Sequence, residues 1–252
     1  MAFLNLAGQR IDYEEIAGTR AGAPLLLLHE GLGSVSLWRE FPAALAAATG
    51  RRVLTYSRAG YGRSIPRRHP FAADYMHREA LEALPALRAA LGLDRPVLLG
   101  HSDGASIALL HAGAGSWPVA ALILEAPHVF VEAVSLESIA AAKVDYETGA
   151  LKPRLARHHA DVETAFYGWN DAWLAPEFRD WNIEPCLSGI TVPTLLIQGA
   201  DDPYGTLAQI EAIERGIAAA VAGLVLANCG HTPHREQQMA VLAAVTRFLA
   251  RL

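Results

Sequence analysis

Short, mostly apolar runs recur along the chain and give the first indication of its secondary structure. They occupy residues 24–29, 52–57, 96–100, 121–124, 193–197 and 224–226. Successive residues of a strand face opposite sides of a sheet, so runs that are apolar at consecutive positions predict strands buried on both faces. Residues 3–17 mix apolar and polar positions around Gly8-Gln9, which predicts a hairpin at the start of the chain.

Segments with apolar residues at helical spacing lie between these runs. Residues 75–91 carry leucines at positions 81, 84, 87 and 91, and comparable patterns cover 102–114, 206–217 and 235–252. Strands that alternate with helices predict an α/β fold, with a mainly parallel central sheet flanked by helices.

One region interrupts this alternation. Residues 128–189 contain no strand-like run, are richer in charge and tryptophan, and predict several helices. We therefore expect a core of residues 1–127 and 190–252, with residues 128–189 inserted as a helical cap. A chain of 252 residues is long enough for this arrangement.

The strongest chemical signal is the sequence Gly100-His101-Ser102-Asp103-Gly104, which follows a predicted strand and opens a predicted helix. A Gly-x-Ser-x-Gly motif in this context forms a sharp, strained turn that lifts the serine hydroxyl above the sheet. The glycines leave room for the new helix, whose N-terminal N–H groups favour a developing negative charge. The pattern predicts Ser102 as a nucleophile.

A serine hydroxyl needs an adjacent base, and an acid that orients the base. Asp201 and Asp202 follow the run at 193–197, while His231 and His234 follow the run at 224–226. Both positions lie at the carboxyl ends of predicted strands, where open α/β sheets form their sites.

Together these motifs resemble the α/β-hydrolase superfamily over nearly the whole chain. In that family the acid commonly stands three residues after a glycine that ends a strand, which favours Asp202 over Asp201 after Gly199. The histidine commonly follows a glycine, which favours His231; His234 is then expected to be solvated or to cap a helix. The resemblance also makes residues 57–64, with their glycines, a structural loop near the site.

The loop His29-Glu30-Gly31-Leu32-Gly33 resembles the family's oxyanion loop, which is usually His-Gly-x-x-Gly. The resemblance implies an oxyanion hole formed by the backbone N–H groups of Gly31 and Asp103, with Leu32 as the alternative if the loop is shifted by one residue. Glu30 replaces the usual glycine. Its carboxylate either points to the surface or faces the substrate, where it would disfavour anionic substrates.

Apolar and aromatic side chains near these loops and in the cap are candidates for the pocket, since binding sites are mostly apolar with few polar groups. Phe166, Trp169 and Trp173 stand at helical spacing and are expected mainly to pack the cap onto the core, with one edge toward the pocket. The predicted substrate-binding residues are Glu30, Leu32, Trp38, His128, Phe130, Trp169, Trp173 and Tyr204.

Composition narrows the possible partners. A net charge of −5 gives no basic footprint for nucleic acid. The longest charge-free apolar stretch, residues 216–227, is too short to span a bilayer. With two cysteines and no signal-peptide pattern at the N-terminus, we expect a cytoplasmic protein.

No nucleotide motif or metal-ligand spacing is present, so no cofactor and no metal are expected. The oligomeric state stays open, with a homodimer as one option.

The function expected from this set is hydrolysis of small to medium, mainly apolar carboxylic esters through an acyl-enzyme. The same triad would serve a carbon–carbon bond hydrolase or a lactonase. Glu30, and a cap without an obvious cationic cluster, count against a dianionic dienoate substrate. An iminopeptidase could bind an amine at Glu132 or Glu163, and a non-catalytic ligand-binding homologue is the alternative from a different class.

Overall fold

The computed structural model describes residues 2–6, 8–65 and 71–252, and these residues form one sheet of eight strands. The strand order is β1-β2-β4-β3-β5-β6-β7-β8, with β1 and β2 antiparallel to their neighbours and the remaining pairs parallel. The strands are β1 (Ala2–Leu6), β2 (Gln9–Ile16), β3 (Leu25–Leu28), β4 (Val53–Tyr56), β5 (Val97–His101), β6 (Ala121–Glu125), β7 (Thr194–Gly199) and β8 (Val221–Leu226). The α/β fold, the N-terminal hairpin and the mainly parallel sheet are confirmed.

Alternating side chains of the inner strands enter two separate cores. Leu25 and Leu27 of β3 belong to one apolar cluster, and Leu26 and Leu28 belong to the other, because a strand's period is two. All four leucines are fully buried. The apolar runs of the sequence therefore mark strands covered on both faces, as expected for a parallel sheet.

The last strand departs from this expectation. The strand β8 begins three residues earlier than the apolar run at 224–226, and its Val225 is 47% exposed. The prediction of burial on both faces is wrong here because β8 lies at the edge of the sheet, paired only with β7 within the described residues.

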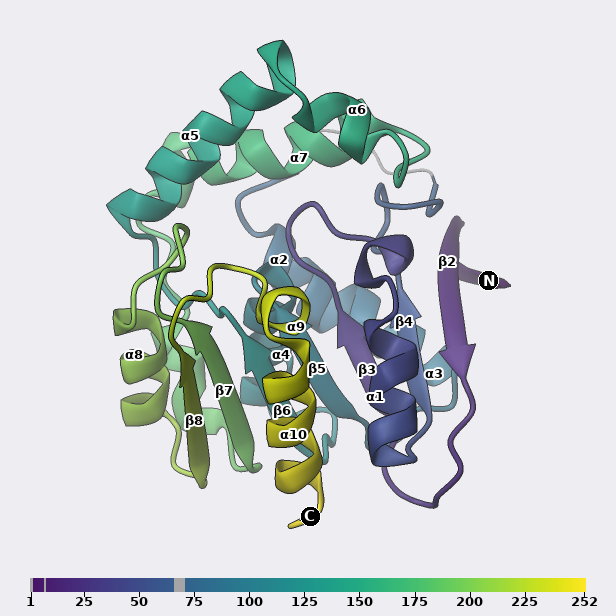
Figure 1. Ribbon diagram of the computed structural model, residues 1–252. Helices are drawn as coiled ribbons and strands as arrows, with labels where there is room; N and C mark the ends of the chain where they lie inside the picture. The colour runs from purple at the N-terminus through teal and green to yellow at the C-terminus, as the bar shows by residue number, and fades with distance from the viewer. Residues whose placement is uncertain (1, 7, 66–70) are drawn as a thin grey trace.

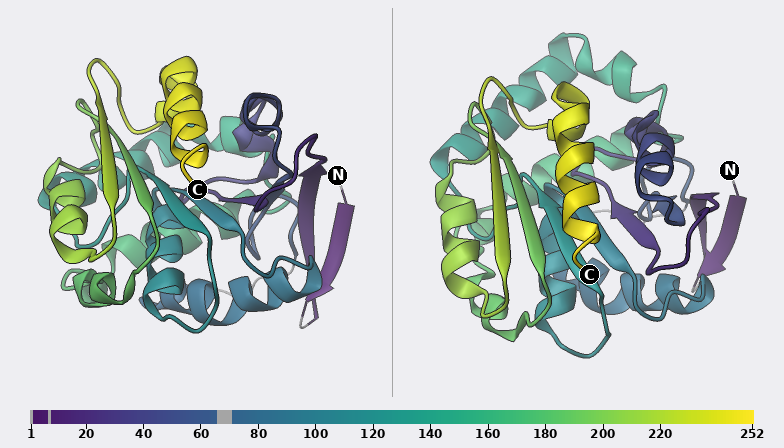
Figure 2. Two further views of the ribbon diagram at one scale, coloured as in Figure 1. Left: turned by 90° about the horizontal axis from the view of Figure 1, so that it is seen from below. Right: turned by 60° about the horizontal axis from the view of Figure 1, so that its bottom comes forward.

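Helices cover both faces of the sheet (Figures 1 and 2). On one face α1 (Phe41–Thr49) packs beside α10 (Gln238–Leu249). On the other face lie α4 (Asp103–Gly113), α8 (Ala208–Gly216) and the segment expected as one helix at 75–91. That segment is α2 (Tyr75–Arg78), a π-helical stretch η2 (Glu79–Ala83) and α3 (Leu84–Ala90). The helix predicted at 235–252 is divided into α9 (Pro233–Glu236) and α10.

The chain between β6 and β7 forms the helices α5 (Ala133–Thr148), α6 (Leu151–Leu155) and α7 (Val162–Leu174), and the short turns η3 (Pro176–Phe178) and η4 (Glu184–Gly189). Figure 1 shows α5, α6 and α7 as a layer over the carboxyl ends of the strands, whereas η4 packs against α4 and α8 beside the sheet. The helical insertion is thus present, and its division from the core at residues 128 and 189 stays a prediction.

Within the described ranges, no helix is both long and apolar enough to cross a bilayer.

Candidate active site

Ser102 occupies a strained turn between β5 and α4. Its backbone has φ 53° and ψ −119°, a conformation that residues other than glycine rarely adopt. A Cβ on Gly104 would lie 2.0 Å from the carbonyl oxygen of Leu28, and a Cβ on Gly100 would lie 2.4 Å from the carbonyl oxygen of Gly104. These backbone contacts explain why the sequence needs glycine two residues before and two residues after Ser102.

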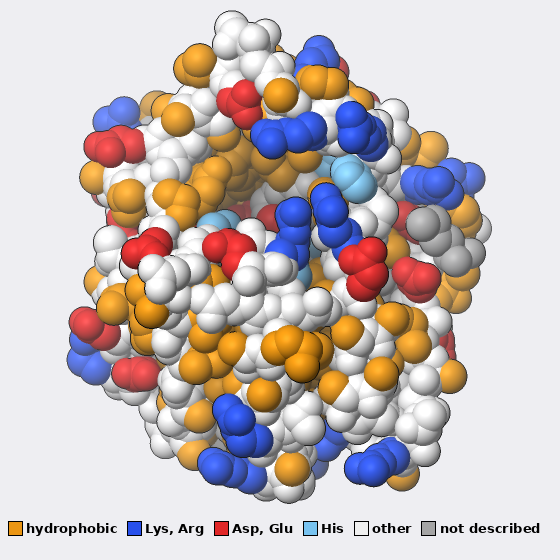
Figure 3. Space-filling model, viewed as in Figure 1, with side chains coloured by type: hydrophobic (Ala, Val, Ile, Leu, Met, Phe, Trp, Pro, Cys, Tyr) orange, Lys and Arg blue, Asp and Glu red, His pale blue; other side chains and the backbone are white. Residues whose placement is uncertain are grey.

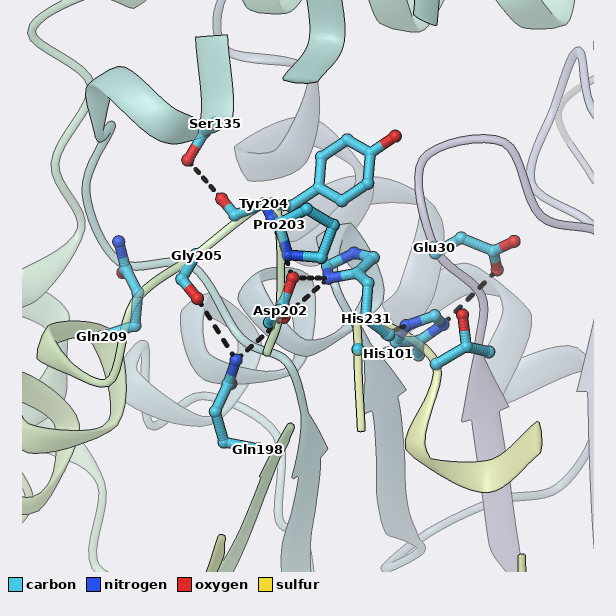
Figure 4. A network of polar contacts seen from close by, with 12 residues as sticks. Glu30, His101, Ser135, Gln198, Asp202, Pro203, Tyr204, Gly205, Gln209 and His231 are labelled. Carbon is cyan, nitrogen blue, oxygen red and sulfur yellow. Dashed lines mark hydrogen bonds and ion pairs between the residues drawn. The ribbon is translucent and has the colours of Figure 1, made fainter. Parts of the chain in front are cut away.

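Asp202 and His231 come from the loops after β7 and β8 and form a close pair (Figure 4). His231 Nδ1 lies 2.8 Å from Asp202 Oδ2 and 2.9 Å from Oδ1. Because a carboxylate only accepts, Nδ1 carries the proton, and neutral His231 then has its lone pair on Nε2. The neighbouring Asp201 is exposed and accepts no side-chain hydrogen bond from His231.

Other groups hold the Asp202 carboxylate in its anionic form. It accepts hydrogen bonds from the Tyr204 backbone N–H at 2.8 Å and from Gln198 Nε2 at 2.8 Å. Burial by itself would raise the pKa of Asp202, but the hydrogen bond and charge of His231 outweigh it, so that its pKa is lowered. The sequence analysis missed Gln198; a polar residue at the end of an apolar strand run was its signal.

Ser102, Asp103 and His231 line one cavity of about 500 Å³ beneath the helical layer. Of the predicted substrate-binding residues, seven line it: Glu30, Leu32, Trp38, His128, Trp169, Trp173 and Tyr204. Phe130 is not among the described lining residues, and its role in substrate binding stays a prediction. Its backbone forms an isolated bridge with Asn182.

Hydrogen bonds from Arg58 hold the predicted oxyanion loop in place. The buried Arg58 guanidinium donates to the backbone carbonyl oxygens of His29 and Glu30. The backbone N–H of Arg58 donates to His29 Nε2 at 3.0 Å. Residues 57–64 therefore have a structural role, as the resemblance implied. A Cβ on Gly31 would lie 2.1 Å from Trp169 Nε1, so the α7 tryptophan closes over this glycine.

Gly31 and Asp103 both line the cavity. Asp103 is the first residue of α4, where N–H groups have no partner within the helix. Its own carboxyl is buried and accepts from Tyr75 Oη and from Trp173 Nε1 at 3.2 Å. The carboxyl of Asp103 is thus engaged by other side chains, whereas its backbone N–H has no partner within the helix.

Residues 25–245 match the sequence profile of the alpha/beta hydrolase family. The chain belongs to this family. It is 27% identical to a proline iminopeptidase of Lactobacillus helveticus over 281 aligned residues, covering 94% of this chain and 93% of that protein.

Solved structures agree with this alpha/beta hydrolase in fold. The proline iminopeptidase of Mycobacterium smegmatis has a TM-score of 0.80 at 22% identity, covering 99% of this chain and 97% of that one. An esterase from Exiguobacterium antarcticum has a TM-score of 0.77 at 20% identity, covering 98% of each chain. At these identities the likeness establishes the fold alone.

In this hydrolase Glu30, which replaces the family's usual glycine, faces the cavity beside His101 (Figure 4). Its Oε2 lies 3.7 Å from His101 Nδ1, and its side chain is 29% exposed. His101 Nε2 donates to the backbone carbonyl of His231 at 2.6 Å. His101 therefore lies between the Glu30 carboxylate and the backbone of the predicted base.

Each member of this pair changes the pKa of the other. Burial opposes the charged form of both, but the charge of His101 lowers the pKa of Glu30 well below its usual range. The charge of Glu30, with a smaller contribution from that of Glu125, raises the pKa of His101. Glu30 thus lines the cavity instead of pointing to the surface, and His101 counters its charge there, while its effect on anionic substrates stays a prediction.

We expect Glu30→Gln to lower the free energy of unfolding by about 1 kcal/mol between about pH 5 and pH 6.5, where both charges are present. The pair's contribution is lost above this window, as pH rises through the raised pKa of His101. It is also lost at acid pH, as pH falls through the lowered pKa of Glu30. Urea denaturation of both proteins at pH 5.5, 7.5 and 9 measures the difference.

Glu177→Gln provides the control, since Glu177 is exposed on η3 and far from this pair in sequence. A stability difference for Glu30→Gln that stays constant from pH 5.5 to pH 9 would contradict the ion pair.

His234, the alternative base, is buried and not solvated as expected. Its Nδ1 lies 2.7 Å from Glu125 Oε2, and its ring packs on Trp38 and Phe41 with centroids 4.8 Å and 5.1 Å away. This second histidine–carboxylate pair was missed because Glu125 ends β6, far away in sequence. Since its Nδ1 engages Glu125 and not Asp202, His234 has no part in the Asp202–His231 pair.

Proposed function

We propose that the chain is a serine hydrolase that cleaves carboxylic esters of small to medium, mainly apolar substrates through an acyl-enzyme. The observation that carries this proposal is the Asp202–His231 pair at 2.8 Å, whose histidine lines the same cavity as Ser102, a serine on a strained strand-to-helix turn. A serine, a histidine and a carboxylate are the residue types that act together in serine hydrolysis, and their positions on three loops support the proposal.

The chemistry follows from these positions. The Ser102 hydroxyl oxygen attacks the ester carbonyl carbon while His231 Nε2 takes its proton. The resulting oxyanion accepts hydrogen bonds from the N–H groups of Gly31 and Asp103. His231 then donates the proton to the departing alcohol oxygen, which leaves an acyl-Ser102. Water attacks the acyl group with the same proton transfers, releasing the acid and restoring the serine.

The cavity walls support a substrate with an apolar body. Leucines and an isoleucine from the oxyanion segment and the cap, together with two tryptophans, surround the polar groups: Leu32, Leu37, Ile139, Leu151, Leu155, Trp169 and Trp173. A volume of about 500 Å³ lies within the range of small-molecule sites. Helices α5 and α6 supply residues that the sequence analysis did not select, because no local pattern shows which face of a cap helix turns inward.

An iminopeptidase is the second candidate, favoured by the relative from Lactobacillus helveticus. The acidic residues considered for amine binding do not support it. Glu132 accepts hydrogen bonds from Thr206 and Gln209, and Glu163 pairs with Lys152 on the surface; neither is among the described lining residues. A lactonase or a carbon–carbon bond hydrolase would use the same three residues.

The first test compares the turnover of p-nitrophenyl acetate and butyrate with that of L-prolyl-p-nitroanilide. The second identifies the labelled residue by mass spectrometry after treatment with a fluorophosphonate. We expect ester turnover with kcat/KM at least about tenfold above the anilide, and a single adduct on Ser102. An adduct on Ser102 without turnover of any ester would favour a ligand-binding protein. Faster turnover of the prolyl anilide would favour the iminopeptidase.

A further inference from the structure

Three arginines converge on the mouth of the cavity from separate parts of the chain. Arg39 follows the short helix η1 (Val35–Trp38), Arg154 lies on α6 of the cap, and Arg235 lies on α9, four residues after His231. All three line the cavity that contains Ser102. In Figure 3, Lys and Arg side chains gather on both sides of the hollow below the helical layer.

The positive charge of these arginines is largely uncompensated. Among the described residues, the guanidinium groups of Arg39 and Arg235 have no carboxylate or hydrogen-bond partner. Arg154 lies 3.3 Å from Asp145, but its side chain is 63% exposed, and such pairs contribute little.

The acidic residues that line the cavity already interact with other side chains of the protein. Of the described lining residues only Glu30 and Asp103 are acidic. Glu30 is countered by His101 at 3.7 Å, and the buried Asp103 carboxyl lies 3.9 Å from Arg58 and accepts from Tyr75. The described lining residues of the cavity therefore include three arginines and two acidic residues, both of which are engaged.

Two further observations agree. Arg39 has φ 52° and ψ −127°, close to the conformation of Ser102, and it is one of four non-glycine residues with positive φ in the described ranges. Residues held in such conformations cluster at functional sites. His158, also at the mouth, has its pKa lowered by burial and by the charges of Arg39, Arg157 and Arg235, against a smaller opposing effect of Glu30.

We propose that this site selects esters that carry a carboxylate remote from the scissile bond, which Arg39 and Arg235 bind with support from Arg154. The guanidinium fork matches a carboxylate in a bidentate manner. The apolar wall between Ser102 and the mouth would hold the body of such a substrate. The proposal depends on the ester hydrolysis proposed above. The sequence analysis looked for a cationic cluster in the cap alone, whereas two of these three arginines come from the core.

The test compares mono-p-nitrophenyl adipate and suberate with their methyl esters, which have the same acyl length and no charge. We expect the acids to have kcat/KM about tenfold higher at low ionic strength, mainly through KM, and the advantage to shrink in 0.5 M salt. In the double variant Arg39→Gln/Arg235→Gln, the ratio between acid and methyl ester should fall close to one. Arg247→Gln, an exposed arginine on α10, should keep both rates.

Binding of the same pairs to Ser102→Ala by calorimetry separates this proposal from the proposed activity. If neither ester is turned over but the acid binds about tenfold more tightly, the hydrolytic function fails and the carboxylate site stands. Equal affinity of acid and methyl ester, or a preference that persists in the double arginine variant, would overturn the carboxylate site.

Discussion

Replacing Ser102 with alanine is expected to lower kcat/KM for p-nitrophenyl butyrate about 10⁴–10⁶-fold while the fold is retained. The hydroxyl supplies the attacking oxygen, and the groups that remain can only bind and polarise the ester. Alanine keeps a Cβ, so the strained backbone at φ 53° should be no harder to form than in the native chain. Initial rates at substrate concentrations well below KM measure the effect.

Ser188→Ala is the matched control, because this serine is exposed on η4 and its hydroxyl makes only a long contact of 3.4 Å with Pro185. Its rate should stay within about twofold of the native rate, as is usual for surface substitutions. Circular dichroism and the thermal midpoint check that both variants are folded. Near-normal ester turnover by Ser102→Ala would refute the proposed nucleophile.

Replacing Asp202 with asparagine is expected to lower kcat about 10³–10⁴-fold. The native carboxylate accepts from His231, Tyr204 and Gln198 at once. An amide has one acceptor oxygen and an NH₂ donor, so it cannot satisfy all three. When its NH₂ faces His231 Nδ1, the imidazole proton moves to Nε2, and the ring can no longer take the proton of Ser102.

Asp201→Asn is the matched control, because it makes the same change at the adjacent aspartate. Asp201 is exposed, and its backbone N–H already donates to the carbonyl oxygen of Cys229 at 2.9 Å, which the substitution leaves in place. Its kcat should change by less than about twofold. If Asp201→Asn abolished turnover while Asp202→Asn did not, the acid would be assigned to the wrong one of two adjacent residues.

The predicted roles of Ser102, Asp202 and His231 came from strong local signals. A strand, a turn and a helix in direct succession constrain each other through backbone contacts of a few residues, as the crowding around Gly100 and Gly104 demonstrates. The choice of Asp202 over Asp201 used only its distance from Gly199, and the structure pairs His231 with this residue. Whether Ser102 and Asp202 act as predicted is decided by the variants above.

Other features of the site left no local signal. Glu30 and His101 are 71 positions apart in the sequence, and Glu125 and His234 are 109 apart. Each pair forms because β3, β5, β6 and the last loop end at the same edge of the sheet. The pattern at each single position was ambiguous, so Glu30 was left with two interpretations and His234 was expected in solvent.

By itself, the sequence determined the α/β fold, the inner parallel strands, the helical insertion and the motif around Ser102, because each depends on the period of apolar residues or on neighbours within one turn. The tertiary structure alone decided that β8 is an edge strand, that His234 is buried against Glu125, and that Arg39, Arg154 and Arg235 line one cavity. These features depend on which segments lie next to each other in space. The burial or charge that a neighbour imposes on a residue cannot be read from the type of that residue or from its local sequence.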